Sequence, residues 1–321
     1  MRILIYGAGV LGSAAAHLLM QGKHEVTMLA RGIRAQQLEQ SGLVIRHHVQ
    51  KRTTTDRPRI IRKLEADDRY DLIFTVMKYS DLEAVLPNLA DNISENIVMI
   101  GNNPDIAATE AEIRRLAGGV KRISFGFQIG GGIRREDGTV VSIQTGGGKL
   151  IVGAMNGEIE FLPLLQQAFA DSRCKIVVHS NIDAWLKTHM ISVVPLAAAW
   201  SSRRGDVKAV ASDRVLLRQV VEAMAEGLEL LEAAGYPAVP ALQARIIRRH
   251  KVAVRMLLSL YHRLPAARLI DGSFAEIQSL DVVFRRWAQT QGRTAPAWKS
   301  LLQEAQNSIQ VASHKNNKII T

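Results

Sequence analysis

Cysteine is almost absent from this chain of 321 residues, because Cys174 is its only one. A single cysteine excludes an intrachain disulfide framework and any zinc or iron–sulfur centre built from several cysteines. The nine histidines form no HExxH motif, and the adjacent His47 and His48 are expected in a loop or at a strand end. We therefore predict that the protein holds no metal and works in a reducing, cytoplasmic setting.

Acidic residues are scarcer than basic ones, 30 against 41, so the formal net charge is +11. This charge permits either a nucleic-acid partner or anionic small molecules. The chain shows no helix-turn-helix, no RNP-type aromatic motif and no basic tail, so we expect no nucleic-acid partner. The densest basic group recurs at helical spacing with apolar residues between, which favours a solvated helix face. It comprises Arg245, Arg248, Arg249, His250, Lys251 and Arg255.

Long hydrophobic runs are missing as well. The longest, residues 191–200, is interrupted by Ser192 and Pro195 and is too short to span a bilayer. The first twenty residues are mostly apolar with Arg2 near their start, as in a signal peptide, but glycines interrupt the apolar stretch. We expect no membrane segment and no secretion.

An alternation of strands and helices fills the first half of the chain. Residues 3–6 and 24–29 are expected to be strands on either side of a helix over 13–22, which makes one βαβ unit. Further strands are expected at 72–76 and 96–100, with helices at 81–89 and 106–116. Such alternation predicts a parallel sheet.

The pattern changes twice after this alternation. Residues 125–133, 139–144 and 149–152 are short alternating runs between glycine turns, and we expect antiparallel strands at the edge of the sheet. Beyond residue 180 long helical periods dominate, for example over 213–234. The predicted fold is α/β, with an N-terminal Rossmann-type doubly wound sheet that carries added antiparallel edge strands, and an all-α C-terminal domain. The expected domains are 1–180, which contains the sheet, and 181–321, which is helical.

A glycine-rich segment directly follows the first strand and opens the first helix. Glycines in tight turns are common, but in this context the backbone N–H groups at the helix N-terminus can receive a pyrophosphate. We therefore predict that a dinucleotide binds at Gly7, Gly9, Val10, Leu11 and Gly12.

The end of the second strand bears on the choice between NAD and NADP. A carboxylate there would accept hydrogen bonds from a ribose 2′-hydroxyl, but the sequence has Arg31 and Arg34 and no acidic residue. A guanidinium suits a 2′-phosphate, and cations near a helix N-terminus are unfavourable unless an anion is bound. We predict NADP, with Arg31 as its phosphate ligand; the alternative is a pair of surface arginines.

Short motifs along nearly the whole chain resemble those of one enzyme family. They are the glycine loop with Arg31, Val76-Met77-Lys78, Gly101-Asn102-Asn103, Trp185-Leu186-Lys187 with Pro195-Leu196 nearby, and Glu276-Ile277. Together they resemble the ketopantoate reductase (2-dehydropantoate 2-reductase) family, which joins a Rossmann domain to a helical domain. The resemblance implies that Lys78 and Asn102 face nicotinamide and substrate, that Lys187 is the catalytic acid, and that Glu276 contacts substrate.

The chemistry of keto-acid reduction agrees with a lysine in that role. Negative charge develops on the carbonyl oxygen as hydride arrives, so a cation or proton donor must stand beside it. At helical spacing Met190, Ile191 and Val194 share the face of Lys187. Burial of that apolar face would make it easier for the lysine to give up its proton. Without the resemblance, Lys187 and Glu276 would be read as solvated side chains, and His189 is read as structural.

The chain departs from the family pattern at polar positions. Two asparagines expected after the lysine are replaced by Ile191 and Pro195, and a serine expected before Glu276 is replaced by Leu264. Such polar groups would bind a hydroxylated keto acid, so a different substrate is also consistent with the sequence. Pro195 is expected to kink its helix.

The predicted function is NADPH-dependent reduction of a 2-keto acid, with 2-dehydropantoate as the family's substrate and a place in pantothenate biosynthesis implied. Two alternatives stay open. One is a paralogous dehydrogenase of another 2-oxo acid or imine, and the other is a non-catalytic NADP-binding regulator. Residues 1–180 are expected to bind NADP, and residues 181–321 to carry the substrate site and any dimer contact. The oligomeric state is open, with a homodimer as one option.

Overall fold

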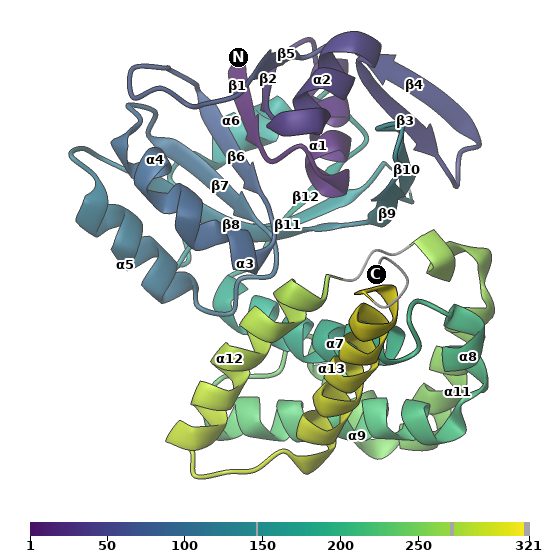
Figure 1. Cartoon of the computed structure of the whole chain (residues 1–321). Coiled ribbons are helices and arrows are strands. Elements are labelled where there is room, and N and C mark those ends of the chain that lie inside the picture. Colours follow the sequence, from purple (N-terminus) through teal and green to yellow (C-terminus); the bar gives the residue numbers. More distant parts are fainter. Residues whose placement is uncertain (146, 270–272, 318–321) are drawn as a thin grey trace. The chain divides into compact units, whose positions relative to one another are not determined.

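The computed structural model of the chain describes residues 1–145, 147–269 and 273–317 (Figure 1). The chain divides into two compact units, Met1–Asp183 and Ala184–Thr321. The first combines strands with helices and the second is helical, which confirms the predicted fold class. The predicted roles of the two units, cofactor binding in one and substrate binding in the other, stay predictions.

The N-terminal unit is built on an eight-stranded sheet. Its strands are parallel except for one antiparallel pair, β8 (Arg122–Ile129) with β11 (Lys149–Gly153). Its central strands are almost wholly apolar, and every residue of β6 is buried, as expected for parallel strands covered on both faces. In order across the sheet the strands are β12 (Lys175–Val178), β11 (Lys149–Gly153), β8 (Arg122–Ile129), β7 (Asn96–Ile100), β6 (Leu72–Val76), β1 (Arg2–Tyr6), β2 (Glu25–Leu29) and β5 (Arg59–Ile61).

Helices connect these strands. On one face of the sheet Ile3 and Ile5 of β1 pack with Ala16 and Leu19 of α1 in a continuous core. The helix expected over 81–89 is broken into three short pieces, because Pro87 has no backbone N–H to donate to Glu83. The helices are α1 (Val10–Gln21), α2 (Gly32–Ser41), α3 (Tyr79–Leu82), the 3₁₀ turn η1 (Glu83–Val85), α4 (Leu86–Asp91), α5 (Ile106–Leu116) and α6 (Leu162–Ala168).

A second, four-stranded sheet lies in the same unit, in the order β4 (Arg52–Asp56), β3 (Leu43–His47), β10 (Val140–Ile143) and β9 (Gly131–Arg134). Antiparallel pairing was expected for β9 and β10 and is found, but both lie in this second sheet rather than at the edge of the first. β8 was also expected at an edge, yet it lies inside the main sheet, parallel to β7. The antiparallel pairing expected for β8 and β11 is found, with β11 beside the edge strand β12. β9 and β10 belong to the second sheet because β10 pairs with β3, which lies almost a hundred residues earlier. The local sequence pattern does not reveal this contact.

The C-terminal unit consists of helices. Its longest amphipathic helices pack side by side, with α9 against α13. The helices are α7 (Ile182–Ser202), which begins just before the division between the units, α8 (Val207–Ser212), α9 (Arg214–Ala233), α10 (Ala241–Arg249), α11 (Lys251–Arg263), the 3₁₀ turn η2 (Pro265–Leu269), α12 (Phe274–Thr290) and α13 (Pro296–Asn317). Pro195 lies inside α7, which continues through it.

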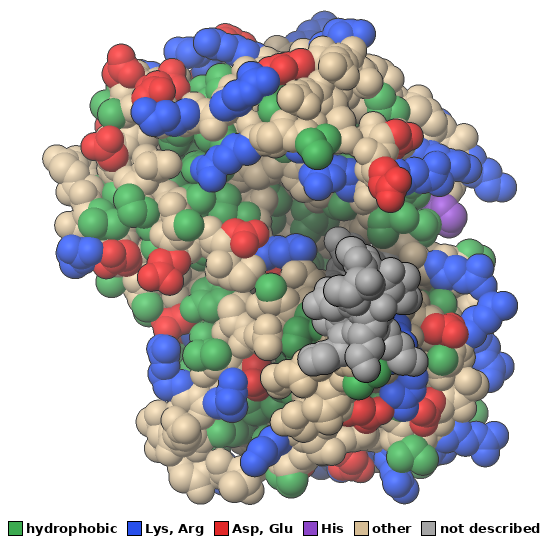
Figure 2. All heavy atoms as spheres, viewed as in Figure 1, with side chains coloured by type: hydrophobic (Ala, Val, Ile, Leu, Met, Phe, Trp, Pro, Cys, Tyr) green, Lys and Arg blue, Asp and Glu red, His purple; other side chains and the backbone are tan. Residues whose placement is uncertain are grey.

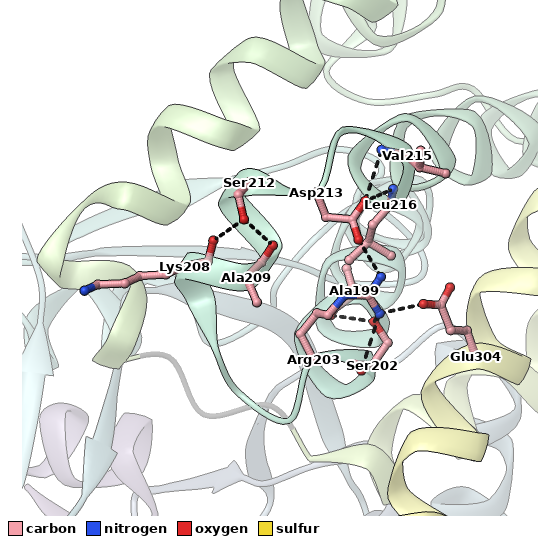
Figure 3. A network of polar contacts seen from close by, with 10 residues as sticks. All are labelled: Ala199, Ser202, Arg203, Lys208, Ala209, Ser212, Asp213, Val215, Leu216 and Glu304. Atoms are coloured by element: carbon pink, nitrogen blue, oxygen red, sulfur yellow. Dashed lines mark hydrogen bonds and ion pairs between the residues drawn. The ribbon is translucent and has the colours of Figure 1, made fainter.

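An arginine just after α7 joins three helices of this unit (Figure 3). The Arg203 guanidinium contacts Asp213 at 2.6 Å and Glu304 of α13 at 2.5 Å. Asp213 also caps α9, accepting hydrogen bonds from the backbone N–H groups of Val215 and Leu216. The hydrogen bond from Arg203 holds the pKa of Asp213 below its usual range. The network therefore fixes where α7 ends and where α9 begins.

Lys and Arg side chains are scattered over the face shown in Figure 2, among acidic and apolar ones, rather than gathered in one patch. Within the described part of the chain, no helix combines the length and the apolar character that crossing a membrane requires.

Candidate active site

In the glycine-rich segment that leads from β1 into α1, two glycines lie where a β-carbon would clash with main chain. Gly7 has φ +124°, and a β-carbon there would lie 2.1 Å from the carbonyl oxygen of Val76 in β6. A β-carbon on Gly12 would lie 1.9 Å from the Gly7 carbonyl oxygen. Both contacts are with main chain, which cannot move aside, so these two glycines let the turn and α1 pack directly against the sheet.

The third glycine, Gly9, faces open space. It is the N-cap of α1, its carbonyl accepts from the N–H of Ser13 at 2.9 Å, and no described atom lies within 4 Å of where its β-carbon would be. Val10 and Leu11 begin the helix, so their N–H groups are among those that have no partner within α1. An open approach to bare main chain at a helix N-terminus fits the diphosphate of a dinucleotide.

Arg34 holds the glycine-rich segment in place through hydrogen bonds. It was not predicted as a site residue. The buried guanidinium donates to the carbonyl of Ala8 at 3.1 Å, to the carbonyl of Gly138 at 2.7 Å and to the hydroxyl of Ser13 at 3.2 Å. Burial, and then repulsion from Arg134, lowers its pKa to about 10. Arg34 therefore joins the glycine segment to the second sheet and does not belong to a pair of surface arginines.

Arg31 is placed differently. It is exposed at the N-cap of α2, directly after β2, and donates to the Tyr6 hydroxyl at 3.0 Å. The first turn of α2 contains no acidic side chain. A guanidinium at the positive end of a helix, with no carboxylate in that turn, can receive an anion.

Lys78 and Asn102 follow two neighbouring strands of the main sheet. β6 and β7 pair with Val76 opposite Ile100, so the residues after them emerge at the same carboxyl edge. A pocket at this edge is lined by Met77, Tyr79 and Asn102, among others, and Lys78 is not one of its lining residues. The carboxyl edge of a parallel sheet is where open α/β folds bind ligands.

Two neighbours of Asn102 have structural tasks. Gly101 has φ +154°, and a β-carbon there would lie 2.4 Å from the carbonyl oxygen of Met77. Asn103 donates to the Thr109 hydroxyl at 2.9 Å and accepts from the N–H of Asp105 at 3.0 Å, which orders the start of α5. All three residues of the Gly-Asn-Asn motif line the pocket, and Gly101 and Asn103 also shape the main chain there.

In the C-terminal unit, Lys187 lies on α7 with 4% of its surface exposed. Its ammonium nitrogen is 4.4 Å from the centroid of the Tyr236 ring and 5.7 Å from that of the Trp287 ring. Met190, Ile191 and Val194, which share its face of the helix, are fully buried. The lysine is thus held against apolar and aromatic side chains within one unit.

The end of α9 explains why Tyr236 reaches the lysine. Gly235 has φ +86°, its N–H donates to the carbonyl of Glu232, and the N–H of Tyr236 donates to that of Leu231. This is a Schellman motif, in which a glycine in the left-handed region ends the helix. It sends the tyrosine back toward the helices instead of onward along the axis of α9.

Glu276 and His189 occupy other positions in this unit. Glu276 lies in the first turn of α12, and its backbone carbonyl accepts from the Ser279 hydroxyl at 2.8 Å. It precedes Trp287 by about three helical turns on the same face, and its contact with substrate stays a prediction. His189 stacks on Trp185, and desolvation lowers its pKa to about 4, so it is neutral at pH 7.

The positions where the family pattern has asparagines are buried here. Ile191 packs against Gly227 of α9, where a β-carbon would lie 2.8 Å from Ile191 Cγ2. Pro195 is also buried. These two side chains of α7 are therefore apolar and buried.

The family model described as "Ketopantoate reductase PanE/ApbA" matches residues 3–157, the part that contains the glycine segment, Arg31, Lys78 and Asn102. The match covers most of the N-terminal unit, which is therefore similar in sequence to the ketopantoate reductases. This confirms the resemblance drawn from the sequence motifs. Two relatives extend the similarity beyond that unit, at low identity.

One relative is the 2-dehydropantoate 2-reductase of Pyrococcus horikoshii, 27% identical over 234 residues, which are 72% of this chain and 73% of the relative. The other is a Bacillus subtilis protein named "Uncharacterized oxidoreductase YkpB", 25% identical over 259 residues, which are 77% of this chain and 80% of the relative. Both support an oxidoreductase family.

Solved structures share the fold over nearly the full length. A D-mandelate dehydrogenase, in a ternary structure with NADH and anilino(oxo)acetate, aligns with a TM-score of 0.76 and 16% identity, over 96% of this chain and 98% of that one. A PanE/ApbA family ketopantoate reductase from Ralstonia eutropha aligns with a TM-score of 0.73 and 18% identity, over 96% and 98%. At such identities the likeness shows the fold alone.

Proposed function

We propose that this protein reduces a 2-keto acid to the 2-hydroxy acid, with hydride from NADPH and a proton from Lys187. The observation that carries the proposal is the burial of the Lys187 ammonium against apolar and aromatic side chains, in a chain whose N-terminal unit matches the ketopantoate reductases. A lysine that only served solubility would extend its ammonium into water.

The N-terminal unit supplies the proposed cofactor site. The backbone from Gly7 to Gly12, with its open approach at Gly9, would bind the diphosphate. The exposed guanidinium of Arg31 favours the 2′-phosphate of NADPH over the free hydroxyl of NADH. Lys78 and Asn102, at the carboxyl edge of β6 and β7, would contact nicotinamide and substrate. The nicotinamide, when bound, supplies the hydride.

The proposed role of Lys187 follows from the charge that the reaction creates. Hydride arriving at C2 pushes an electron pair onto the carbonyl oxygen, and a nearby ammonium stabilises that charge before it donates a proton. Lys187 is buried, so water screens this interaction less than it would at the surface. Glu276 would contact the substrate, as the family resemblance implies.

The first candidate substrate is 2-dehydropantoate, the substrate named for the Pyrococcus relative. A second candidate is another 2-oxo acid, or an imine formed from one, with an apolar side chain. Ile191 and Pro195 favour it, because apolar groups stand where the family pattern has amides. The D-mandelate dehydrogenase neighbour was solved with an aromatic 2-oxo acid derivative.

A steady-state assay tests the proposal. Purified protein is given NADPH, or NADH as a control, with 2-dehydropantoate and a panel of aliphatic and aromatic 2-keto acids. Turnover with 2-dehydropantoate would support the first candidate, and turnover only with apolar acids would support the second. Tight NADPH binding without turnover on any acid would contradict the enzymatic proposal and favour a non-catalytic NADP-binding protein.

We also propose a homodimer, because one structural neighbour, from Staphylococcus aureus, is described as dimeric. Light scattering on the purified chain checks this. A mass of one chain, 35.4 kDa, at micromolar concentration would contradict it.

A further inference from the structure

The surroundings of Lys187 contain two aromatic rings, which we call the aromatic seat: Tyr236 and Trp287. The seat lies wholly within the C-terminal unit, with Tyr236 from the segment after α9 and Trp287 from α12. The ammonium is 4.4 Å from the centroid of the tyrosine ring, inside the range in which the negative face of a ring attracts a cation. Because Lys187 is only 4% exposed, water screens this attraction weakly.

The tyrosine is held on both sides in the chain. Before it, the Gly235 turn fixes its backbone to the end of α9. After it, the N–H of Val239 donates to the Thr188 hydroxyl at 3.0 Å, and that hydroxyl donates to the carbonyl of Ala184 at 2.8 Å. Thr188 is the residue next to Lys187, so the segment that carries the ring is tied to the same turn of α7 as the lysine.

We propose that Tyr236 is a positioning residue that holds the Lys187 ammonium through the face of its ring, an inference that rests on the proposed role of Lys187. A ring face attracts the cation without accepting its proton. Trp287, at 5.7 Å, contributes less.

A fluorination series tests the ring face separately from the ring's shape. Tyr236 is replaced by Phe and then, by nonsense suppression, by Phe with increasing numbers of ring fluorines, which weaken the negative face with little change in size. We expect Tyr236→Phe to keep kcat within about threefold of the unmodified protein. We expect kcat to fall stepwise with fluorine number, by about 10- to 30-fold across the series. Tyr236→Leu should fall at least as far.

The matched control is Tyr261 of α11, a half-buried tyrosine that contacts His262 and belongs to the same unit. The same series at Tyr261 should leave kcat unchanged. Equal kcat across the Tyr236 series would overturn the proposal, because a ring needed only for packing is insensitive to fluorination. A loss in Tyr236→Phe as large as in Tyr236→Leu would also overturn it, since the hydroxyl would then be the active part.

A measurement without turnover keeps the inference separable from the proposed function. In protein with ¹³C-labelled lysine, ring currents should shift the ε-methylene signal of Lys187 upfield of the other lysines, with assignment by Lys187→Met. Tyr236→Phe should keep this shift and Tyr236→Leu should lose most of it. Turnover of a keto acid without the upfield shift of the Lys187 signal would overturn the role of Tyr236 but not the proposed function. The shift without turnover on any keto acid would overturn the proposed function, and the role of Tyr236 with it.

Discussion

Gly227 of α9 faces Ile191 of α7 so closely that a β-carbon at residue 227 would lie 2.8 Å from Ile191 Cγ2 and 2.9 Å from Cδ1. This contact sets how near the two helices approach beside Lys187. Gly227→Ala should therefore destabilise the protein by about 1–2 kcal/mol, since overpacking outweighs the gain in helix propensity.

The same change should cost little or nothing in an Ile191→Ala background, where the added methyl fills vacated space. Urea unfolding of the two single variants and the double variant measures the coupling. Equal costs of Gly227→Ala in both backgrounds would show that the two residues do not limit the approach of the helices.

Alanine substitution at two glycines of the N-terminal segment should affect different properties: stability at Gly12 and NADPH binding at Gly9. Gly12→Ala places a β-carbon against the Gly7 carbonyl and should lower the free energy of unfolding by several kcal/mol. Gly9→Ala meets open space in the described structure, so stability should change by less than about 1 kcal/mol, while NADPH binding should weaken at least tenfold. Unfolding curves and fluorescence titration with NADPH separate the two effects. Unchanged NADPH affinity in Gly9→Ala would contradict the proposal that the diphosphate of NADPH binds at this position.

Arg31 should set the preference for NADPH. Removing its exposed guanidinium takes away a charge-assisted contact with the 2′-phosphate, worth about 1.5–3 kcal/mol. Arg31→Ala should thus lower kcat/KM with NADPH by about 10- to 100-fold and leave kcat/KM with NADH nearly unchanged. Arg115→Ala on α5, an exposed arginine paired with Glu112, is the matched control and should change neither value. Equal losses with both cofactors would mean that Arg31 does not read the phosphate.

His189 should make the C-terminal unit sensitive to acid. Desolvation lowers its pKa from 6.5 to about 4 in the folded chain. Between these values the unfolded chain binds the proton and the folded chain does not, so stability is lost as pH falls from about 6.5 to 4. The loss reaches at most about 3 kcal/mol at 1.36 kcal/mol per pKa unit. His189→Gln should flatten the pH dependence of the unfolding free energy by this amount, and an identical slope in the variant would contradict the assignment.

The N-terminal βαβ unit was predictable because its signals are local. The apolar strand β1, the glycine segment and the helix that ends before Gly22 follow one another in sequence and structure alike. Strands β3, β4 and β5 were not predicted. β4 reads Arg-Thr-Thr-Thr-Asp and is only partly buried, so it carries no apolar alternation, and its sheet is completed by β10 from far along the chain.

The residues that shape the candidate site were predictable only in part. Arg31 and Lys187 were found, one from its place after a strand and the other from the family resemblance. Arg34 looks the same as Arg31 in sequence, and only the fold shows that one guanidinium is buried while the other is exposed. Gly235 signals the end of a helix, which could have drawn attention to Tyr236. Its contact with a lysine almost fifty residues earlier depends on how α7 and α9 pack.

The central claim is that Lys187 gives the proton in keto-acid reduction, and Lys187→Met tests it most directly because methionine keeps the apolar stem and removes the ammonium. The variant should oxidise NADPH with the preferred keto acid about 10² to 10⁴ times more slowly, while its NADPH affinity and unfolding curve stay unchanged. Lys208→Met, at an exposed lysine of α8, should behave as the unmodified protein. A full rate in Lys187→Met would contradict the account.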